Sequence, residues 1–371
     1  MVLDRPLRIL HVLRAPLGGL FRHVGDLAKA QSERGHLVGI IADSGHYGEA
    51  SEAALKQLAA VCKLGVMRIP MSRQIGMNDR HAIAHVAARA AESNADILHG
   101  HGAKGGAYAR LARTNALRAY TPHGGSLHYS KLSPLGFVYL NLEKRLAKRT
   151  DVFLFESDYS LNVFRRKIGT PKAIARVVHN GVTPEELTAI KPDKDAADVI
   201  FIGELRKLKG VDVLITALAR SPHSALLFGG GPDAEAFHNE VAKRGLASRI
   251  QFAGPMPARE AFRRGRVLVV PSRAESLPYI VLEAAAGSVP LIATQVGGIP
   301  EIFGSDVDAL IQPNDPAALA AAIDNALIEP PLARTARLHA RVAASFTVSA
   351  MTDGVLAAYG EAMRARAPAG R

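Results

Sequence analysis

The chain has 371 residues, of which 48% are hydrophobic, and a formal net charge of +12. This length and composition predict two domains with two hydrophobic cores. The single cysteine, Cys62, excludes internal disulfides and indicates a reducing compartment. The apolar run near the N-terminus is too short and too interrupted by arginine for a signal peptide, and no apolar stretch reaches the ~18 residues of a membrane-spanning helix. A cytoplasmic location is expected.

The positive charge lies in the N-terminal half of the chain. Residues 1–190 hold 26 Lys and Arg against 15 Asp and Glu, a net of +11, whereas residues 191–371 hold 20 against 19, a net of +1. The basic half could attract an anionic membrane surface, a lipid-phosphate acceptor or nucleic acid. A basic surface that only faces water is an equally good interpretation. Nucleic acid is not expected, because no binding motif or aromatic platform accompanies the basic residues.

Short Val/Ile/Leu runs alternate with Ala-rich helical stretches, which predicts an α/β fold with parallel sheets. Residues 8–13 form a first buried strand, a helix follows over about 20–34, and residues 37–42 form the next strand. Further strands are expected at 97–99, 119–121 and 152–155.

The polar, charged stretch 191–198 is the best candidate for a linker between domains. A second α/β series begins at residue 199, with strands at 224–228, 250–252, 267–270 and 291–294. The tail over 346–366 is helical. We therefore expect one domain over 1–190 and a second over 191–345.

Three candidate sites in the N-terminal half follow predicted strands. Gly18 and Gly19 come after the first strand, where missing Cβ atoms let backbone amides approach a ligand. His99 ends the strand at 97–99, and His101 comes two residues later. They are as well explained by structural hydrogen bonds, and two histidines without nearby carboxylates or cysteines make a poor metal site. His123, flanked by glycines after the strand at 119–121, is a stronger candidate.

Two polar segments farther along have simpler interpretations. Ser157 could cap a helix as readily as contact an acceptor. The Asn180-Gly181 pair is typical of a turn.

The C-terminal half carries a basic turn in the segment FIGELRKLKG at 201–210. Arg206 and Lys209 precede a helix that begins at about Val211. Cations beside helix N-terminal amides suit a diphosphate that must be held while negative charge develops on it. A basic turn facing water would look the same if the motif stood alone. Two glycine-containing turns follow later strands, at Gly230 and at Gly254.

Residues 267–304 contain the most informative pattern of the chain. A strand leads into a turn with Glu275, a short helix starts near Pro278 and carries Glu283, and a second strand runs into a glycine pair. Ligands of such units lie at the carboxyl ends of the strands. Two carboxylates there suit a polyhydroxylated ligand, because a carboxylate accepts the hydrogen bonds that sugar hydroxyls donate.

In this context the segment resembles the E-x7-E signature of the retaining family-4 glycosyltransferases of the GT-B fold. The basic turn resembles the family's G-R-L-x-x-x-K-G turn, with Glu204 at the usual arginine position and Arg206 two residues later. The segment around His123 resembles the family's T-x-H-G. The matches run from Gly18 to Glu301 in the family's order.

The resemblance implies two Rossmann-like domains facing each other across a cleft, with residues 346–371 packing back on the first domain. The second domain would hold a UDP-sugar or GDP-sugar donor, and the first a saccharide or lipid-linked acceptor, in cell-surface polysaccharide or glycolipid synthesis. The protein could be peripheral on the inner face of the cell membrane.

The resemblance also assigns roles. Glu283 would bind the ribose, Glu275 the hexose, and His123 would position the sugar. Arg206 and Lys209 would stabilise the leaving diphosphate in place of a metal, since no Asp-x-Asp motif stands at a strand end. Further donor contacts are implied by position in the motifs, at Gly18, Gly19, Gly230, Gly254, Met256, Ser276 and Leu277. Alternatives are a GT-B epimerase, a phosphorylase, or a non-catalytic sugar-nucleotide-binding protein.

Overall fold

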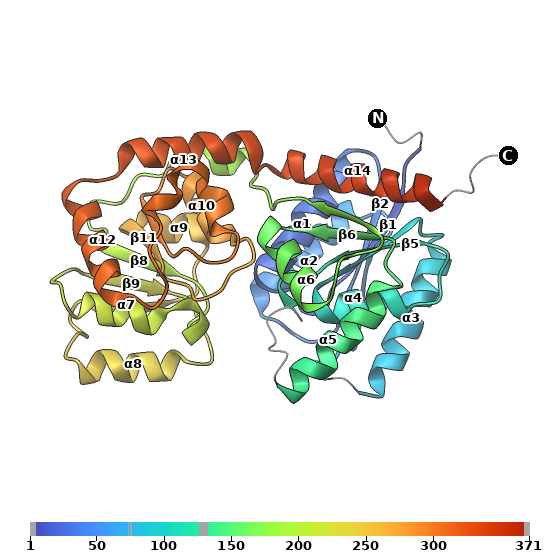
Figure 1. The fold of residues 1–371 in the computed structure, drawn as a ribbon, viewed down its shortest axis with the longest axis horizontal. Helices are drawn as coiled ribbons and strands as arrows, with labels where there is room; N and C mark the ends of the chain where they lie inside the picture. Colours follow the sequence, from blue (N-terminus) through green and yellow to red (C-terminus); the bar gives the residue numbers. More distant parts are fainter. Residues whose placement is uncertain (1–4, 73, 75, 126–132, 367–371) are drawn as a thin grey trace. The chain divides into compact units, whose positions relative to one another are not determined.

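The computed structural model describes residues 5–72, 74, 76–125 and 133–366. These residues form two compact α/β units (Figure 1). The first unit contains the chain up to Asn180 together with the segment from Val348 onward, and the second contains Gly181–Thr347.

The units divide at residue 180, whereas the linker composition had indicated 190. Residues 181–190 belong to the second unit because their backbone is hydrogen-bonded there. The Val182 N–H donates to the Phe346 carbonyl, and the Ile190 N–H donates to the Gly287 carbonyl, each over 2.8 Å.

The first unit is built on a parallel sheet, as the sequence predicts. Its two edge strands are short and only partly buried, and they lack the continuous apolar run by which the other strands were found. In spatial order the strands are β3 (Val66–Ile69), β2 (Leu37–Asp43), β1 (Arg8–Val12), β4 (Ile97–His101), β5 (Leu117–Thr121), β6 (Val152–Phe155) and β7 (Ile174–Val177).

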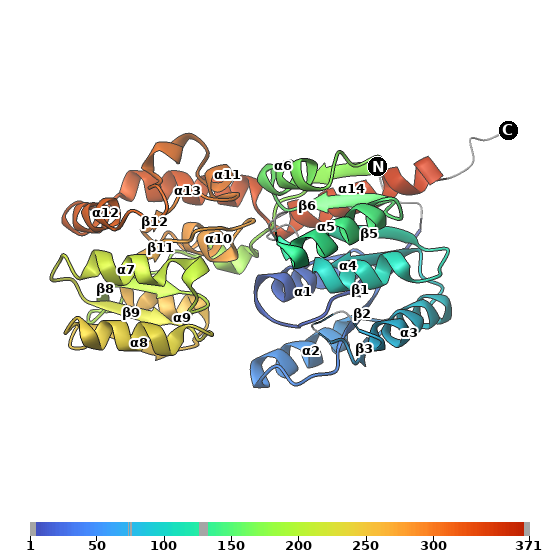
Figure 2. The same cartoon turned by 60° about the horizontal axis from the view of Figure 1, so that its bottom comes forward.

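Helices cover both faces of this sheet (Figure 2). They are α1 (Gly18–Glu33), α2 (Glu49–Val61), α3 (Asn78–Glu92), α4 (Gly102–Leu111), α5 (Pro134–Ala147), α6 (Asp158–Lys167) and α14 (Val348–Arg366). The last helix of the chain, α14, packs against α1 and β6, so the C-terminal segment returns to the first unit as predicted. Its Met351, Val355 and Tyr359 join Ile9 and Leu154 of the sheet in one buried cluster.

The second unit has a smaller parallel sheet. In spatial order its strands are β10 (Ile250–Gly254), β9 (Ala225–Phe228), β8 (Ala197–Ile202), β11 (Gly265–Val270) and β12 (Leu291–Ala293). The helices are α7 (Val211–Leu218), α8 (Ala234–Lys243), α9 (Ala258–Arg263), α10 (Tyr279–Ala286), α11 (Ile299–Phe303), α12 (Pro316–Ile328) and α13 (Leu332–Ser345), with short 3-10 helices η2 (Pro184–Leu187), η3 (Lys207–Lys209) and η4 (Gly304–Ala309).

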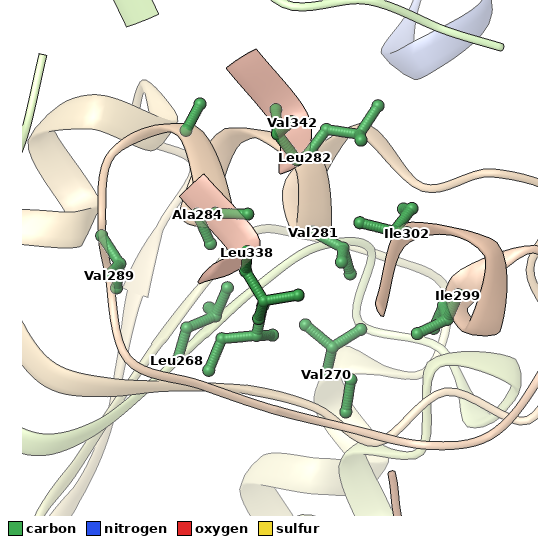
Figure 3. Close-up of a cluster of buried hydrophobic side chains, with 14 of the residues drawn as sticks. Leu268, Val270, Val281, Leu282, Ala284, Val289, Ile299, Ile302, Leu338 and Val342 are labelled. Atoms are coloured by element: carbon green, nitrogen blue, oxygen red, sulfur yellow. The ribbon is translucent and has the colours of Figure 1, made fainter. Parts of the chain in front are cut away.

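The helix α10 is held in the core of the second unit. Figure 3 shows its Val281 and Leu282 among side chains of β11 and α13, including Leu268, Val270 and Leu338. Since this helix carries Glu283 and directly follows the loop of Glu275, the packing fixes both carboxylates to one rigid element.

A buried ion pair joins α4 to α5, which lie side by side in the first unit (Figure 2). The Arg110 guanidinium donates to both carboxylate oxygens of Glu143, over 2.5 and 3.2 Å, and lies 3.7 Å from the centre of the Tyr120 ring. Burial alone would lower the pKa of Arg110, but attraction to Glu143 and contacts with Tyr120 raise it above the ordinary value. The arginine is therefore charged inside the protein, and its charge requires Glu143.

Replacing Glu143 by Gln should destabilise the first unit by about 3–5 kcal/mol, because it leaves the Arg110 charge buried without a counter-charge. The matched control is Glu240→Gln, which breaks the exposed pair between Glu240 and Arg244 and should cost less than about 0.5 kcal/mol. Chemical denaturation of both variants measures the difference. Equal midpoints would show that the buried pair is not needed for stability.

Candidate functional site

Two residues predicted for the second unit form an ion pair at the carboxyl ends of neighbouring strands. Lys209 ends η3 after β8, and Glu275 lies in the loop after β11. The Lys209 ammonium donates to Glu275 Oε1 over 2.7 Å, and the Ser272 hydroxyl donates to the same oxygen over 2.7 Å. The chain leaves β8 and β11 in opposite directions across the sheet. Open α/β sheets bind ligands at such a point.

Two glycines allow the loops to come this close. Gly210 has φ 71°, and a Cβ atom there would lie 1.9 Å from the Pro271 carbonyl oxygen. Gly297 has φ 60°, and a Cβ atom there would lie 1.9 Å from the carbonyl oxygen of Glu275 itself. Any side chain at either position would push the loop of Glu275 away from its place.

Arg206 lies on the same loop as Lys209, but its ionic contact is with Glu204, at 3.8 Å, and its side chain is 47% exposed. A different guanidinium braces the loops. Arg273 donates to both carboxylate oxygens of Asp212, at the start of α7, over 2.7 and 2.8 Å. The sequence analysis missed Arg273, because nothing in the local pattern shows a contact between residues 61 positions apart.

The other donor residues predicted for the second unit differ in their burial and in their place in the fold. Glu283 is half-buried in the middle of α10. Gly230 and Gly254 lie in turns at the ends of β9 and β10 and have no atom within 4 Å of an added Cβ. Ser276 follows Glu275, and its carbonyl accepts a hydrogen bond from the Gly298 N–H over 2.7 Å. The side chain of Leu277 belongs to the core, and that of Met256 is partly buried against it.

The first unit contains a cavity of about 650 Å³ at the carboxyl ends of β1, β4 and β5. Its walls are mostly apolar and include Leu17, Leu20, Ile83, Leu111, Leu142 and Leu146. The polar side chains of the lining include the cations Arg14 and Lys104, the histidines His101 and His123, and the carboxylates Asp79 and Glu143. Lys104 is paired with Asp79 over 2.6 Å, and Arg14 donates to the Tyr47 hydroxyl over 3.4 Å. The cavity therefore combines an apolar wall with two cations, one of which already has a counter-charge.

The sequence analysis placed Gly18 and Gly19 before a helix that begins at about residue 20. In the structure they are the first two residues of that helix, α1. Gly18 has φ 62° with open space around it, so its conformation requires glycine, whereas no neighbour restricts its size. The adjacent Leu17 and Leu20 line the cavity, which places this helix start beside it.

The predicted histidines belong to a cluster of five. His99 and His101 lie inside β4, not after it, because the strand continues to His101. His123 follows β5 with φ 49°. The fold adds His11 from β1 and His23 from α1, which the sequence analysis did not single out. Their positions, 11, 23, 99, 101 and 123, are too far apart in sequence to be read as one group.

Hydrogen bonds link this histidine cluster to fixed partners. His123 Nε2 lies 3.1 Å from His101 Nδ1, and His101 Nε2 pairs in turn with His11 Nδ1 over 2.9 Å. On its other side, His123 Nδ1 lies 3.3 Å from a carboxylate oxygen of Glu156. The side chain of His123 is only 6% exposed. Both of its ring nitrogens thus face protein groups.

Burial controls the charge of these rings. It lowers the pKa of His11 to about 4. Burial, followed by repulsion from the neighbouring histidines, lowers the pKa of His23, His99 and His101 well below the ordinary value. These four rings are therefore neutral at physiological pH.

Of the two other polar segments, the first behaves as the simpler interpretation expected. The Ser157 hydroxyl caps α6 by accepting a hydrogen bond from the Ser160 N–H over 3.1 Å. Asn180 and Gly181 do not form the expected turn, and the side chain of Asn180 lies 2.9 Å from His23 Nδ1, where it supports the histidine cluster.

Comparison with known families assigns both units. A model described as Glycosyltransferase Family 4 matches residues 17–186, and a model described as Glycosyl transferases group 1 matches residues 183–342. The boundary between the two matches falls close to the division between the units.

Curated relatives agree with this assignment. The D-inositol 3-phosphate glycosyltransferase of Mycolicibacterium vanbaalenii is 31% identical, over 50% of this chain and 48% of the relative. The enzyme of the same name from Stackebrandtia nassauensis is 29% identical, over 73% of this chain and 69% of the relative. The chain spans about half the length of most of the curated relatives it matches.

Solved structures show the fold. Sucrose-phosphate synthase from Thermosynechococcus elongatus has a TM-score of 0.79 at 21% identity, covering 97% of this chain and 100% of that chain. The Anabaena protein HepE, solved with UDP and glucose, has a TM-score of 0.79 at 19% identity, covering 96% of this chain and 100% of that chain. The chain therefore has the GT-B fold, and its two units match the Glycosyltransferase Family 4 and Glycosyl transferases group 1 models in turn.

Proposed function

We propose that the protein is a retaining glycosyltransferase that moves a hexosyl unit from a nucleotide-diphosphate sugar to a saccharide or lipid-linked acceptor. The second unit binds the donor and the first binds the acceptor. The observation that carries the proposal is the ion pair of Lys209 and Glu275, held where the strand connections of the second sheet diverge. This is one cation and one anion at the place where a parallel sheet binds its ligand.

Each member of this pair suits a different part of the donor. The ammonium of Lys209 is a point charge for the diphosphate, and the carboxylate of Glu275 accepts hydrogen bonds from the hexose hydroxyls. Without donor, the two groups neutralise each other over 2.7 Å. Donor binding exchanges that contact for two, one to each part of the sugar nucleotide. In the absence of substrate, neither charge of the pair is therefore left without a counter-charge.

The leaving diphosphate gains negative charge as the glycosidic bond breaks. Arg206 and Lys209 stabilise that charge without a metal on the diphosphate, and the exposed Arg206 side chain is free to turn from Glu204 toward it. Glu283 receives the ribose hydroxyls from α10. Retention of the anomeric configuration is proposed from the E-x7-E spacing of Glu275 and Glu283 alone.

His123 contributes through its backbone in this proposal. Its ring is 6% exposed and lies within hydrogen-bonding reach of His101 and Glu156, whereas the residue as a whole is partly exposed. The ring therefore fixes the position of the loop, and the main chain contacts the sugar.

The cavity of the first unit supports an amphiphilic, anionic acceptor. Its apolar walls suit a hydrocarbon chain, and Arg14 suits a phosphate, which Lys104 would join on leaving Asp79. The curated relatives are named for a phosphorylated acceptor, D-inositol 3-phosphate, which also calls for cations. We therefore favour a lipid-linked phosphate or saccharide over a neutral, free sugar. As donor we favour a UDP-sugar over a GDP-sugar, since the Anabaena protein was solved with UDP.

The surface of α5 supports contact with an anionic membrane. Three apolar side chains at its start are exposed by more than half, Leu135, Phe137 and Val138. Four basic residues lie at its end and just beyond it, Lys144, Arg145, Lys148 and Arg149. No helix in the described residues is long and apolar enough to cross a bilayer. We propose peripheral binding of this helix at the cytoplasmic membrane face.

Replacing Lys209 or Glu275 by Ala should reduce transfer at least ~10²-fold, as expected when an oriented charged group is removed from a developing charge. Lys207→Ala is the matched control, because Lys207 lies on the same loop, is exposed and should leave the rate unchanged. The assay offers UDP-, GDP- and ADP-sugars with lipid-linked and free acceptors, and product analysis gives the anomeric configuration.

Three results would contradict this function. Unchanged rates in both variants would remove the pair from the mechanism. Conversion of the sugar nucleotide without any acceptor would indicate an epimerase. Nucleotide-sugar binding without turnover would indicate a non-catalytic binding protein.

Phe137→Asp should weaken binding to anionic vesicles, and raising the salt concentration should weaken binding of the unchanged protein, because both apolar insertion and charge attraction contribute. The control is Ile328→Asp, an equally drastic change at a side chain of the second unit that is 83% exposed. Flotation with vesicles of neutral or anionic lipid measures both effects. Equal binding to the two lipids, or equal loss in the two variants, would exclude this surface.

A further inference from the structure

The histidine cluster of the first unit has features that the proposed transfer reaction does not use. Three of its members, His23, His101 and His123, each offer one ring nitrogen within 4.8 Å of the others. They come from three different elements: the helix α1, the strand β4 and the loop after β5. A group held by three packed elements has little freedom to rearrange.

The outer nitrogens of these rings face hydrogen-bond acceptors. His23 Nδ1 lies 2.9 Å from the Asn180 amide oxygen, and His123 Nδ1 lies 3.3 Å from the Glu156 carboxylate. Since both partners accept, both Nδ1 atoms carry the proton. The remaining nitrogen of each ring, Nε2, then presents a lone pair.

The same reasoning applies to His101 through its neighbour His11. His11 Nε2 lies 2.8 Å from the Gln31 amide oxygen and therefore carries a proton, so His11 Nδ1 accepts the hydrogen bond from His101 Nε2. His101 Nδ1 is left with a lone pair. It faces the lone pair of His123 Nε2 at 3.1 Å. In this tautomeric arrangement no proton lies between the two nitrogens, and a cation beside them would satisfy both lone pairs.

Two buried groups point to the same need. Among the described residues, His23 Nε2 has no hydrogen-bond partner. The Glu156 side chain is 5% exposed and its second oxygen, Oε2, also has no partner in that part of the chain. A buried polar atom without a hydrogen-bond partner is costly, and a bound cation close to both groups would offset that cost.

We propose that His23, His101 and His123 form a binding site for a divalent transition metal ion of the Zn²⁺ class. Neutral imidazole is a preferred ligand of Zn²⁺, with metal–nitrogen distances of about 2.0–2.1 Å, which separates two tetrahedral ligands by about 3.3 Å. The 3.1 Å between His101 Nδ1 and His123 Nε2 is close to that separation. His101 and His123 line the cavity, so a metal ion can enter from there and take a water or another oxygen ligand.

The partners behind the ligands match the pattern of metal sites. A histidine that binds a metal almost always donates its other N–H to a carboxylate, a carbonyl or a similar acceptor. His123 has Glu156, His23 has Asn180, and His101 has His11. The other triad, His11, His99 and His101, is less suited, because both nitrogens of His99 are hydrogen-bonded to side chains outside the cluster, those of Thr121 and Tyr359.

The test is titration of the full chain, freed of metal by a chelator, with Zn²⁺ and with Co²⁺ in the absence of donor and acceptor. We expect one tightly bound Zn²⁺ per chain by calorimetry and the strong visible absorption of tetrahedral Co²⁺. His23→Gln should abolish both signals, and Glu156→Gln should weaken affinity by about 10–100-fold because it removes only a partner of a ligand. His81→Gln, at an exposed histidine of α3, should change nothing.

Circular dichroism and the thermal midpoint of each metal-free variant establish that it is folded, and Glu156→Gln decides the matter should His23→Gln fail to fold. Absence of a tight site would overturn the proposal. It would mean that the Gln31 amide donates to His11 and that ordinary N–H···N bonds join the rings. Equal binding in Glu156→Gln and in the unchanged protein, or loss of binding in His81→Gln, would assign the metal to surface histidines. All outcomes are read without turnover, so they are separate from the transfer reaction.

Discussion

Parallel strands end at a common edge, and both units depend on this constraint. In each sheet one pair of neighbours, β1 with β4 and β8 with β11, marks the place where the strand connections change direction. The two connections leave toward opposite faces of the sheet there, so a crevice opens between their loops at the strand ends. The cavity and the histidine cluster lie at the first of these positions, and the ion pair of Lys209 and Glu275 lies at the second. Segments up to a hundred residues apart are thus brought together by topology alone.

The two positions handle charge in different ways. In the second unit the lysine and the carboxylate neutralise each other and remain partly accessible, with Lys209 28% exposed. Such a pair can open at small cost, because water and substrate can replace either partner. In the first unit the groups are buried, and each histidine is fixed by a specific acceptor. A pair that exchanges partners suits a substrate, whereas a rigid group of ligands suits a resident ion.

Much of this architecture could be predicted from the sequence. The alternating apolar runs located most of the central strands, and the pattern around Glu275 and Lys209 pointed to two residues that the structure joins directly. Edge strands such as β3 and β7 were missed because a half-exposed strand has no continuous apolar run. Arg273, His11 and His23 were missed for another reason. Their partners lie 61 to about 100 residues away, and one sequence without its fold carries no signal for such contacts.

The return of α14 to the first unit has a consequence for the order of folding during synthesis. The face formed by Leu7, Ile9 and Leu154 is covered by Met351, Val355 and Tyr359 of that helix. Residues 5–180 leave the ribosome with this apolar face open to water, and Gly181–Thr347 can complete its own core first. The second unit can therefore complete its fold before the first unit does. The first unit is complete only after α14 has left the ribosome and covered the N-terminal sheet. In a cell, the surface open to a chaperone during synthesis would be the apolar face of the N-terminal sheet, which is made first.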